Sequence, residues 1–479
     1  MNSYVFNTFA SFLKVIKRII PWDTETNGKE GAKSGYSQIT QFGLLELDDD
    51  LNILSEHEQS SKLLDYITPE PEALLITHNI QSLFEGQSEY KMMWAIDKIF
   101  NSVKRNGYSV GVTYNGDQFD EPIFYHARHR NLLSPYLTST NGSGKWDLLT
   151  SIKLFTNFYG DVDFPLTEKG NLSLKLVNVA KAFGISAAGA HDAVADARMV
   201  HEILKVFKKE FPEVYYSGLV HASKAGSLEM LKHSEDYLLH GQVYGKTFST
   251  PAVFCGRGEI GSTANTVAIF DLHFNPEDII NSTEHELETE DAIGKSGSPI
   301  KLVQINKTVP VLPVGSIKDP DTLFDIPHSE LCKRAKVIKS DPSFHQRVSN
   351  ILSRRMYKKG VSKSPEEAIY ESFTGKEDIL YAEGFSLADN CQRWGMVNNF
   401  QDSRWREFSK RILVEEDFDN APNVVKNWYL NFIDKRLHNE GFGMTNEQAL
   451  NQTIDLIENA SGEDRKILMT LKSFLEGRI

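Results

Sequence analysis

Apolar positions in the first two hundred residues recur with periods of two and of about 3.6. Strand-like segments lie at Ile39–Leu47, Leu51–Leu54 and Ser109–Tyr114, and helix-like segments at Tyr90–Val103, Leu172–Phe183 and Ala193–Phe207. The acidic run Asp48-Asp49-Asp50 separates the first two strands as a turn would. Strands followed by alternating helices and strands predict an α/β domain that ends near residue 210.

The pattern changes twice after that domain. Val267–Leu272 and Ile300–Ile305 predict strands, and the acidic stretch from Glu284 to Asp291 between them predicts a long polar insertion. Beyond residue 350 the pattern is helical to the end, as in Gln448–Ile457 and Asp464–Leu475. We therefore predict three domains, at residues 1–210, 211–352 and 353–479.

The N-terminal segment has apolar residues at helical spacing, Phe6, Phe9, Leu13 and Ile16, and positive charge after them. A signal peptide has the reverse order, so we expect a docked or frayed amphipathic helix rather than a targeting segment. No window approaches the length of apolar residues that spans a bilayer. Three widely spaced cysteines predict neither a disulfide scaffold nor a cysteine-based zinc site, and they fit a reducing compartment. We expect a cytoplasmic protein.

Composition and charge narrow the class of function only slightly. The 479 residues are 40% hydrophobic and 24% charged, which is typical of globular proteins. The 52 Lys and Arg against 65 Asp and Glu leave a net charge of −13. This balance argues against coating of nucleic acid through bulk positive charge, but it does not exclude a nucleic-acid enzyme with a local groove and metal ions.

Two carboxylates, Asp23 and Glu25, lie two positions apart at the end of a predicted strand, so they point to one face. Paired acids on one face repel each other unless a cation lies between them. The run Asp-Thr-Glu-Thr-Asn-Gly is also good turn composition, and a turn is the alternative interpretation.

Three more residues strengthen the metal interpretation. Asp120 follows a buried strand, and Asp117 in the same loop is more typical of a turn residue. His191 lies in the loop before a predicted helix and Asp196 in the first turns of that helix. Acids at a helix N-terminus are also favoured by the helix dipole alone. Four acids and one histidine are what two-metal phosphodiester hydrolysis requires: oxygen ligands for Mg²⁺ and a group that takes a proton from water.

The order Asp-x-Glu, Asp, His-x4-Asp resembles the DEDDh 3′–5′ exonucleases of the ribonuclease H-like superfamily. Within them the chain resembles the bacterial exonuclease I family along nearly its whole length. The segments that carry this resemblance are Trp146-Asp147-Leu148-Leu149, Ala190-His191-Asp192-Ala193, Pro299–Val311 and Ile369–Phe373. The resemblance implies a ribonuclease H-like α/β domain with a mixed central sheet, a small SH3-like β-rich domain and an all-α C-terminal domain. It implies processive 3′–5′ degradation of single-stranded DNA to 5′-mononucleotides, in DNA repair and recombination.

The resemblance also implies roles for individual residues. Asp23 bridges two Mg²⁺ ions, for which Mn²⁺ can substitute, and Asp196 binds one of them. Glu25 ligates metal and helps to place the water, Asp120 supports the site, and His191 is the general base. Contacts to substrate are implied for Thr24, Thr26, Asn115, Phe119 and Lys175.

One feature departs from the family pattern. Pro21 directly precedes Trp22 and Asp23, and proline is unusual in a central strand. The sequence therefore leaves the strand before Asp23 open.

Positive and aromatic residues of the C-terminal part predict the DNA groove. They are Arg354, Arg355, Tyr357, Lys358, Lys359, Lys363, Arg404, Trp405 and Arg406. Solvated helix faces are the alternative interpretation of each of these charge runs.

The family implies a partner, the acidic C-terminal tail of the single-stranded DNA-binding protein, for which Lys333, Arg334 and Lys336 are candidates. We expect a monomer that does not bind membranes. Two other functions stay open: a 3′–5′ exoribonuclease, because the chemistry does not itself reject a 2′-hydroxyl, and a catalytically silent single-strand-binding protein.

Overall fold

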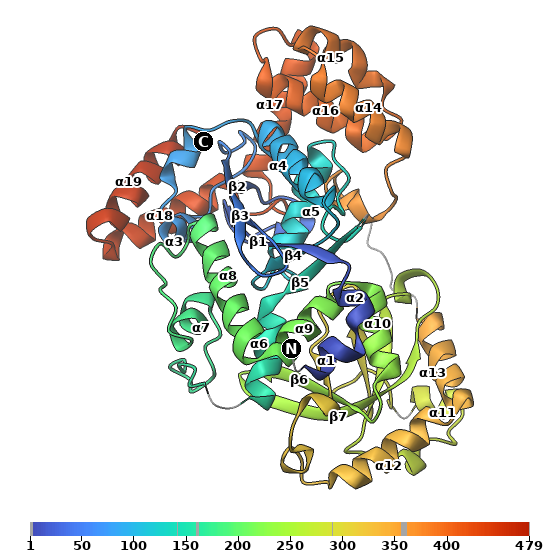
Figure 1. Ribbon diagram of the computed structural model, residues 1–479. Helices are drawn as coiled ribbons and strands as arrows, with labels where there is room; N and C mark the ends of the chain where they lie inside the picture. The colour runs from blue at the N-terminus through green and yellow to red at the C-terminus, as the bar shows by residue number, and fades with distance from the viewer. Residues whose placement is uncertain (1–2, 141, 160–161, 290, 356–361, 479) are drawn as a thin grey trace.

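A five-stranded mixed sheet forms the centre of the N-terminal part of the chain (Figure 1). The computed structural model describes residues 3–140, 142–159, 162–289, 291–355 and 362–478. The sheet order is β3-β2-β1-β4-β5. Its strands are β1 (Ile16–Thr26), β2 (Ile39–Leu47), β3 (Ile53–Ser60), β4 (Tyr108–Thr113) and β5 (Ser143–Asp147). The pairs β1–β2 and β2–β3 are antiparallel, and β1–β4 and β4–β5 are parallel, so the predicted mixed sheet is confirmed.

Helices cover both faces of this sheet because its strands are apolar on both. Along β1, Ile19 packs into the core beneath α8, whereas Ile20 and Trp22 pack into a separate core beneath α4 and α5. The helices of this part are α3 (Pro71–Thr77), α4 (Glu89–Lys104), α5 (Asp120–Arg130), α6 (Leu148–Phe158), α7 (Leu176–Ala182), α8 (Ala193–Glu210) and α9 (Pro212–His221). Odd-numbered positions of β1 therefore face α8, and even-numbered positions face α5.

Pro21 lies inside an uninterrupted β1, which settles what the sequence left open. Its partner in β4 is Val112. The pairing with β2 keeps one register on both sides of Pro21, from Ile19↔Leu47 to Trp22↔Leu44. Proline removes only one ladder donor, and the remaining pairs on both sides maintain the strand.

The N-terminal residues form two short helices, α1 (Tyr4–Thr8) and α2 (Ala10–Leu13), so the predicted single helix to Ile16 is wrong. Ile16 already belongs to β1. The Glu213 carboxylate accepts hydrogen bonds from the backbone N–H groups of Tyr4 and Val5, which fixes α1 against α9. The segment is docked, as the burial of Phe9 and Leu13 shows.

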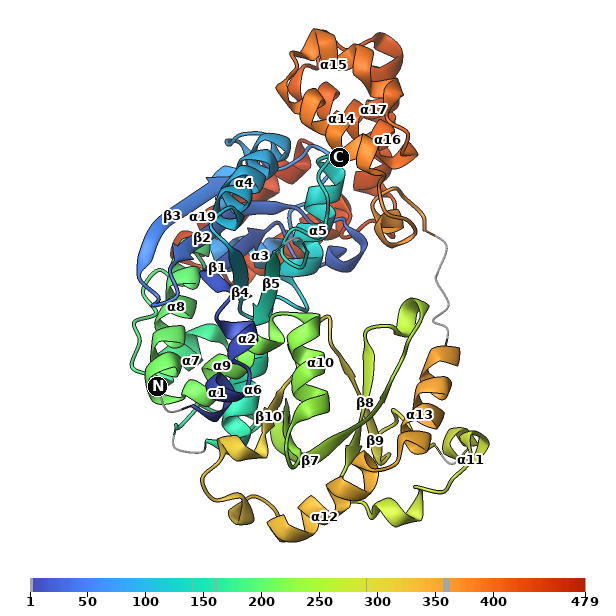
Figure 2. The same cartoon turned by 45° about the vertical axis from the view of Figure 1, so that its right-hand side comes forward.

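A second five-stranded sheet, entirely antiparallel, follows in the order β10-β6-β7-β8-β9. Its strands are β6 (Leu238–Tyr244), β7 (Lys246–Arg257), β8 (Thr266–Asp271), β9 (Ile300–Gln304) and β10 (Val311–Pro313). It is associated with α10 (Lys224–His233), α11 (Glu284–Thr289), α12 (His328–Lys339) and α13 (Pro342–Arg354), of which α10, α12 and α13 contact β7 (Figure 2). The acidic stretch predicted as a polar insertion includes α11, because Leu287 anchors it in the core.

The remaining chain is helical, as predicted. Its helices are α14 (Lys376–Leu387), α15 (Asn390–Met396), α16 (Ser403–Glu416), α17 (Asn423–His438), α18 (Asn446–Asn459) and α19 (Gly462–Glu476). The last two helices return to contact α3, and Leu471 and Leu475 share a core with Leu63 and Leu64. The C-terminal end thus packs on the N-terminal part (Figure 1). None of the described helices is long and apolar enough to cross a bilayer.

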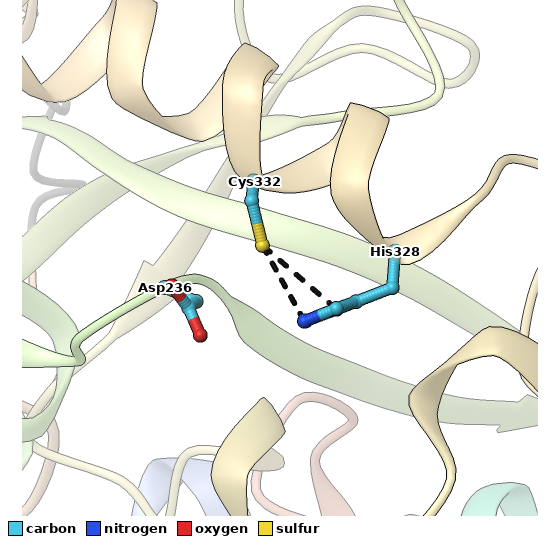
Figure 3. A group of neighbouring side chains, drawn as sticks. All are labelled: Asp236, His328 and Cys332. Carbon is cyan, nitrogen blue, oxygen red and sulfur yellow. Dashed lines mark hydrogen bonds between the residues drawn. The ribbon is translucent and has the colours of Figure 1, made fainter.

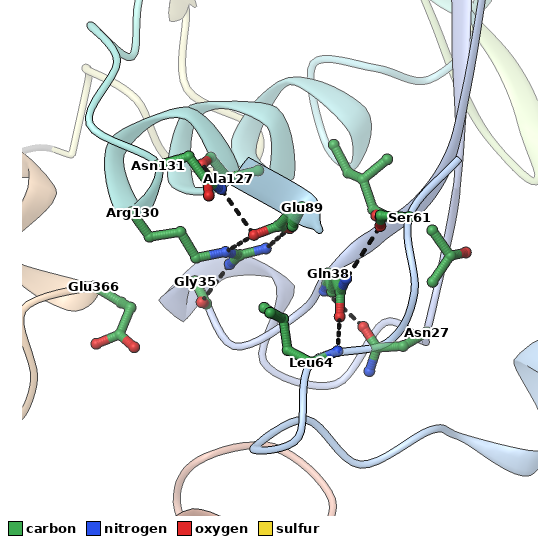
Figure 4. A network of polar contacts seen from close by, with 12 residues as sticks. Asn27, Gly35, Gln38, Ser61, Leu64, Glu89, Ala127, Arg130, Asn131 and Glu366 are labelled. Atoms are coloured by element: carbon green, nitrogen blue, oxygen red, sulfur yellow. Dashed lines mark hydrogen bonds and ion pairs between the residues drawn. The ribbon is translucent and has the colours of Figure 1, made fainter. Parts of the chain in front are cut away.

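Figure 4 shows two groups of buried polar contacts, one that joins α4 to α5 and one around Gln38, next to the end of β1. Arg130 donates to both carboxylate oxygens of Glu89 and to the carbonyl of Gly35. Asn27, one residue after β1, accepts a 2.6 Å hydrogen bond from the N–H of Gln38. Because these groups are buried and satisfied by specific partners, they fix where β1 ends.

Candidate functional site

Asp23 and Glu25 lie on the α8 face of β1, the central strand of the mixed sheet. Burial, and then the charges of Asp120, Glu25 and Asp196, hold the pKa of Asp23 well above its ordinary value. Burial and the charges of Asp196, Asp120 and Asp192 raise the pKa of Glu25 to about 9. The chain thus concentrates acids where each disfavours ionisation of the next.

Asp196 and His191 approach the same face from α8 and the loop before it. The N–H of His191 donates a 3.2 Å hydrogen bond to Asp196 Oδ1. His191 is exposed and has φ = 71°, a left-handed conformation that a β-branched residue would rarely adopt. Asp192 caps α8 by accepting from the N–H of Ala195, so the cap interpretation holds for Asp192.

Glu25, His191 and Asp196 each present a ligand atom within 4.8 Å of the other two. Two carboxylate oxygens and an imidazole nitrogen at this spacing fit a divalent cation. Asp23 lies near these groups: its pKa is raised by burial and then by the charges of Asp120, Glu25 and Asp196. A cation bound among these groups would lower their pKa values and keep them ionised.

Asp120 enters from the opposite side, as the first residue of α5. It is buried, and its Oδ1 accepts a 2.6 Å hydrogen bond from Thr24 Oγ1. Burial raises the pKa of Asp120 to about 7 against this hydrogen bond, which lowers it. The structure therefore brings four acids and one histidine to the end of β1, from one strand, two helices and the loop before α8.

Gly43 of β2 is a site residue that the sequence interpretation missed. It pairs with Asp23 across the sheet. A Cβ at this position would lie 2.4 Å from backbone atoms of both Ala193 and Val194. Only glycine allows the start of α8 to approach the sheet this closely, and that approach places Asp196 beside Glu25. A glycine inside a strand pattern was the available signal.

The residues predicted to contact substrate differ in burial and in their hydrogen-bonding partners. Thr24 and Thr26 are both buried, and their hydroxyls bond Asp120 and the Gly28 carbonyl. Asn115 has φ = 65° and donates its N–H to Asp147 Oδ1. Phe119 packs against the core beneath α4 and α5. Lys175 is exposed just before α7.

Asp117 does more than form a turn. Its carboxylate pairs with Lys145 Nζ at 2.6 Å and accepts a 2.8 Å hydrogen bond from the N–H of Thr308. Thr308 Oγ1 in turn accepts a 2.7 Å hydrogen bond from the N–H of Asp147. These bonds connect the loop that precedes Asp120 to the antiparallel sheet region.

Two of the predicted groove residues are structural instead. Trp405 is fully buried and donates Nε1–H to His129 Nδ1. Arg404 is also buried, and its guanidinium is occupied by Asp402 and by the carbonyls of Ala368 and Ser372. The helical pattern gave no sign that this face turns inward. Arg406 and Lys363 are exposed, Arg354 pairs with Glu284, and Arg355 donates to the Ile293 carbonyl. Tyr357, Lys358 and Lys359 lie outside the described residues.

The antiparallel sheet instead presents a cavity of about 1030 Å³ lined by aromatic and cationic side chains. Tyr244 is 76% and Phe248 52% exposed, and Lys295, Lys301 and Lys307 lie around them. A second cavity, about 690 Å³, is lined by Lys307 as well, together with Lys33, Lys224, Tyr136 and the Asp117 loop. Lys307 thus lines both cavities, and the second cavity reaches the loop that precedes Asp120.

The fold and the site define the class: an α/β protein in which four acids and one histidine meet at the end of the central strand of a mixed sheet. No protein-family profile matches the chain. Exodeoxyribonuclease I of Buchnera aphidicola (Acyrthosiphon pisum) is 24% identical over 85% of this chain and 99% of its own length. Exodeoxyribonuclease I of Escherichia coli is 23% identical over 95% of this chain and 90% of its own.

Solved structures give the same result for the fold. Exonuclease I from Methylocaldum szegediense covers 97% of this chain with a TM-score of 0.78 and 20% identity, and all of that chain is matched. Escherichia coli exonuclease I in complex with a dA16 oligonucleotide covers 97% with a TM-score of 0.77 and 18% identity. The resemblance to bacterial exonuclease I is confirmed, and the chain has the exonuclease I fold. Further solved structures include a zinc-bound form of the Escherichia coli protein with single-stranded DNA, and SSB/exonuclease I in complex with an inhibitor.

Proposed function

We propose that the chain is a metal-dependent 3′–5′ exonuclease that degrades single-stranded DNA to 5′-mononucleotides, in DNA repair and recombination in the cytoplasm. The observation that carries this proposal is the convergence of Glu25, His191 and Asp196 within 4.8 Å, beside Asp23 and Asp120, in an exonuclease I fold. Similarity to exodeoxyribonuclease I along most of the chain supports DNA as the substrate.

The site residues have three roles in the proposed reaction: metal binding, proton transfer and positioning of the ligands. Asp23, Glu25, Asp120 and Asp196 would hold two Mg²⁺ ions. When bound, such ions stabilise the attacking and leaving oxygens of the scissile phosphate. His191, exposed and next to Asp196, takes the proton of the attacking water. Thr24 orients Asp120, and the Asp192 cap fixes the start of α8, so the ligands are positioned before substrate arrives.

The substrate path follows from the two cavities joined by Lys307. Exposed aromatic rings such as Tyr244 and Phe248 offer faces on which bases stack, and the lysines around them neutralise the charge of the phosphates. Among the described residues, Lys307 and Lys224 have no carboxylate within ion-pair distance, so their charge is available to a phosphate. A strand lying in both cavities would be held along several nucleotides, which favours processive digestion.

The deciding experiment digests single strands labelled at either the 3′ or the 5′ end, with and without Mg²⁺, beside a duplex and a matched RNA. Mononucleotides released from the 3′ end of DNA alone, and only with metal, support the proposal. Equal digestion of RNA would favour the exoribonuclease. Binding without any digestion would favour a silent single-strand-binding protein. Replacing Mg²⁺ by Mn²⁺ in the same assay determines the preferred ion.

A partner is proposed on the same basis: the acidic C-terminal tail of the single-stranded DNA-binding protein, bound by a monomer of this chain. On α12, Lys333 and Lys336 are exposed beside the partly exposed Val337, which offers positive charge next to an apolar side chain. Arg334 is less available, because it donates to Glu330 and to the Leu272 carbonyl. Binding of a fluorescent tail peptide to the wild type and to Lys333→Ala/Lys336→Ala tests this position, and sedimentation tests the monomer.

A further inference from the structure

A second group of metal-ligating side chains lies away from the nuclease site, on the antiparallel sheet region (Figure 3). Asp236 precedes β6, and His328 and Cys332 lie one turn apart at the start of α12. Their ligand atoms all lie within 4.8 Å of one another. They comprise a carboxylate oxygen, an imidazole nitrogen and a sulfur, whereas none of the nuclease residues has a sulfur.

The ligand atoms lie close enough for one ion to bind all three. Cys332 Sγ is nearly equidistant from the two ring nitrogens of His328, at 3.6 Å from Nε2 and 3.8 Å from Nδ1. Bonds of about 2.3 Å to sulfur and about 2.0 Å to nitrogen keep the donor atoms of a tetrahedral zinc site about 3.5 Å apart, so the imidazole must turn to direct one nitrogen at the ion. The Asp236 carboxylate lies within 4.8 Å of both and supplies the third ligand. Asp236 is exposed, so the fourth position is open to water.

One ring nitrogen of His328 has a hydrogen-bonding partner of its own. His328 Nδ1 lies 3.1 Å from Tyr237 Oη, and the backbone N–H of His328 donates a 2.8 Å hydrogen bond to Asp321 Oδ1. When Tyr237 Oη accepts the Nδ1 proton, the lone pair of Nε2 is left for a cation. Ligating histidines usually hold their other ring nitrogen in this way.

We propose that Asp236, His328 and Cys332 bind one Zn²⁺ ion that ties the start of β6 to the start of α12. The thiolate, imidazole and carboxylate are zinc ligands, and Mg²⁺ prefers oxygen alone. Cys332 releases its thiol proton to solvent when the ion binds, and no electron is transferred. The ion joins two segments that are far apart in sequence, so it stabilises the packing of α12 on the sheet.

Cobalt binding to the full-length chain tests the site, because Co²⁺ bonded to a thiolate absorbs in the near ultraviolet and the nuclease site cannot produce that band. The reduced, metal-free protein is titrated anaerobically with Co²⁺. We expect a charge-transfer band that saturates at one equivalent and is displaced by one equivalent of Zn²⁺. Cys332→Ser should abolish the band, and His328→Gln and Asp236→Asn should weaken Co²⁺ binding at least about tenfold.

Cys391→Ser is the matched control, since Cys391 is also a free thiol but lies exposed on α15. It should keep the band. Absence of a band in the wild type, or a band that survives Cys332→Ser, overturns the proposal. Melting curves guard against misfolded variants: Zn²⁺ should raise the Tm of the wild type and of Cys391→Ser by more than that of Cys332→Ser, in which only the nuclease site is left to bind the ion. An equal rise in all three would also contradict the site.

Discussion

Thr24 Oγ1 donates a 2.6 Å hydrogen bond to Asp120 Oδ1, which links the central strand of the sheet to the first residue of α5. Both residues are buried. Asp23 and Glu25 face α8 on the other side of the same strand. One strand segment therefore positions acids on both of its faces, two directly and one through a hydroxyl.

Loss of this hydroxyl should weaken metal binding without unfolding the protein. Thr24→Val keeps the shape and removes the donor, so we expect a loss of about 10- to 100-fold in Mg²⁺ affinity or in rate. Thr24→Ser should restore most of it. The measurement is the rate of digestion as a function of Mg²⁺ concentration. An unchanged metal dependence in Thr24→Val would show that the bond has no positioning role.

Asp23→Ala should abolish hydrolysis and leave DNA binding measurable, because the side chain belongs to the metal site and the cavities lie elsewhere. Asp49→Ala, a substitution of an exposed turn acid, is the control and should digest at the normal rate. Labelled-strand digestion and a binding titration in parallel give both readouts. Near-normal Mg²⁺-dependent digestion by Asp23→Ala would refute the assignment of the site.

Gly43→Ala should reduce activity although Gly43 carries no chemistry. Its Cβ would lie 2.4 Å from backbone atoms of Ala193 and Val194, so the start of α8 must move away from the sheet. A displacement of about 1 Å can cost about 100-fold in rate, and strain of this kind costs about 1–3 kcal/mol of stability. Gly395→Ala, where a Cβ meets nothing within 4 Å, is the control for rate and for urea unfolding.

DNA binding should weaken steeply with salt despite the net charge of −13. Lys307 lies where the two cavities meet, so Lys307→Ala should lower the affinity and reduce the slope of log K against log salt by about 0.7, the value for one phosphate on a single strand. Lys205→Ala on the exposed side of α8 should leave the slope unchanged. An affinity that is flat between low and moderate salt would contradict the groove.

Acid should act against the fold at three buried histidines, His126, His129 and His221, whereas the site acids Asp23, Glu25 and Asp120, whose pKa values are raised, act in the opposite direction. Burial lowers the pKa of His126 and His221 to about 4 and that of His129 to about 3. Below the unfolded pKa of about 6.5 the unfolded chain binds protons that the folded chain does not, so stability is full above that pH. It should fall by about 1.4 kcal/mol per pH unit per histidine, down to the folded pKa.

Urea unfolding at pH 7, 6 and 5 measures this loss. His129→Gln, which keeps an acceptor for Trp405, should make the dependence on pH shallower. His438→Gln at the surface should not. An equal pH dependence in the wild type and in His129→Gln would contradict the buried, neutral state of His129.

The sequence by itself determined the local elements and the chemical types at the site. Periodicity located β2, β4, α4 and α8 to within a few residues, because burial on one face or two leaves a repeating pattern. The spacing of Asp23 and Glu25 placed both on one face of a strand. The resemblance supplied the fold and indicated that Asp120, His191 and Asp196 belong to the same site.

Only the tertiary structure decided which side chains meet. Pro21 could remain in a central strand because neighbouring pairs maintain the ladder, and no local pattern reveals that. From the sequence, Trp405 and Arg404 resemble groove residues, but the packing of α16 buries them. Tyr244 and Phe248 are exposed and line a cavity that the net charge of the chain could not predict. Contacts such as Thr24–Asp120 and Gly43 against α8 join segments distant in sequence, and their existence depends on how whole elements pack.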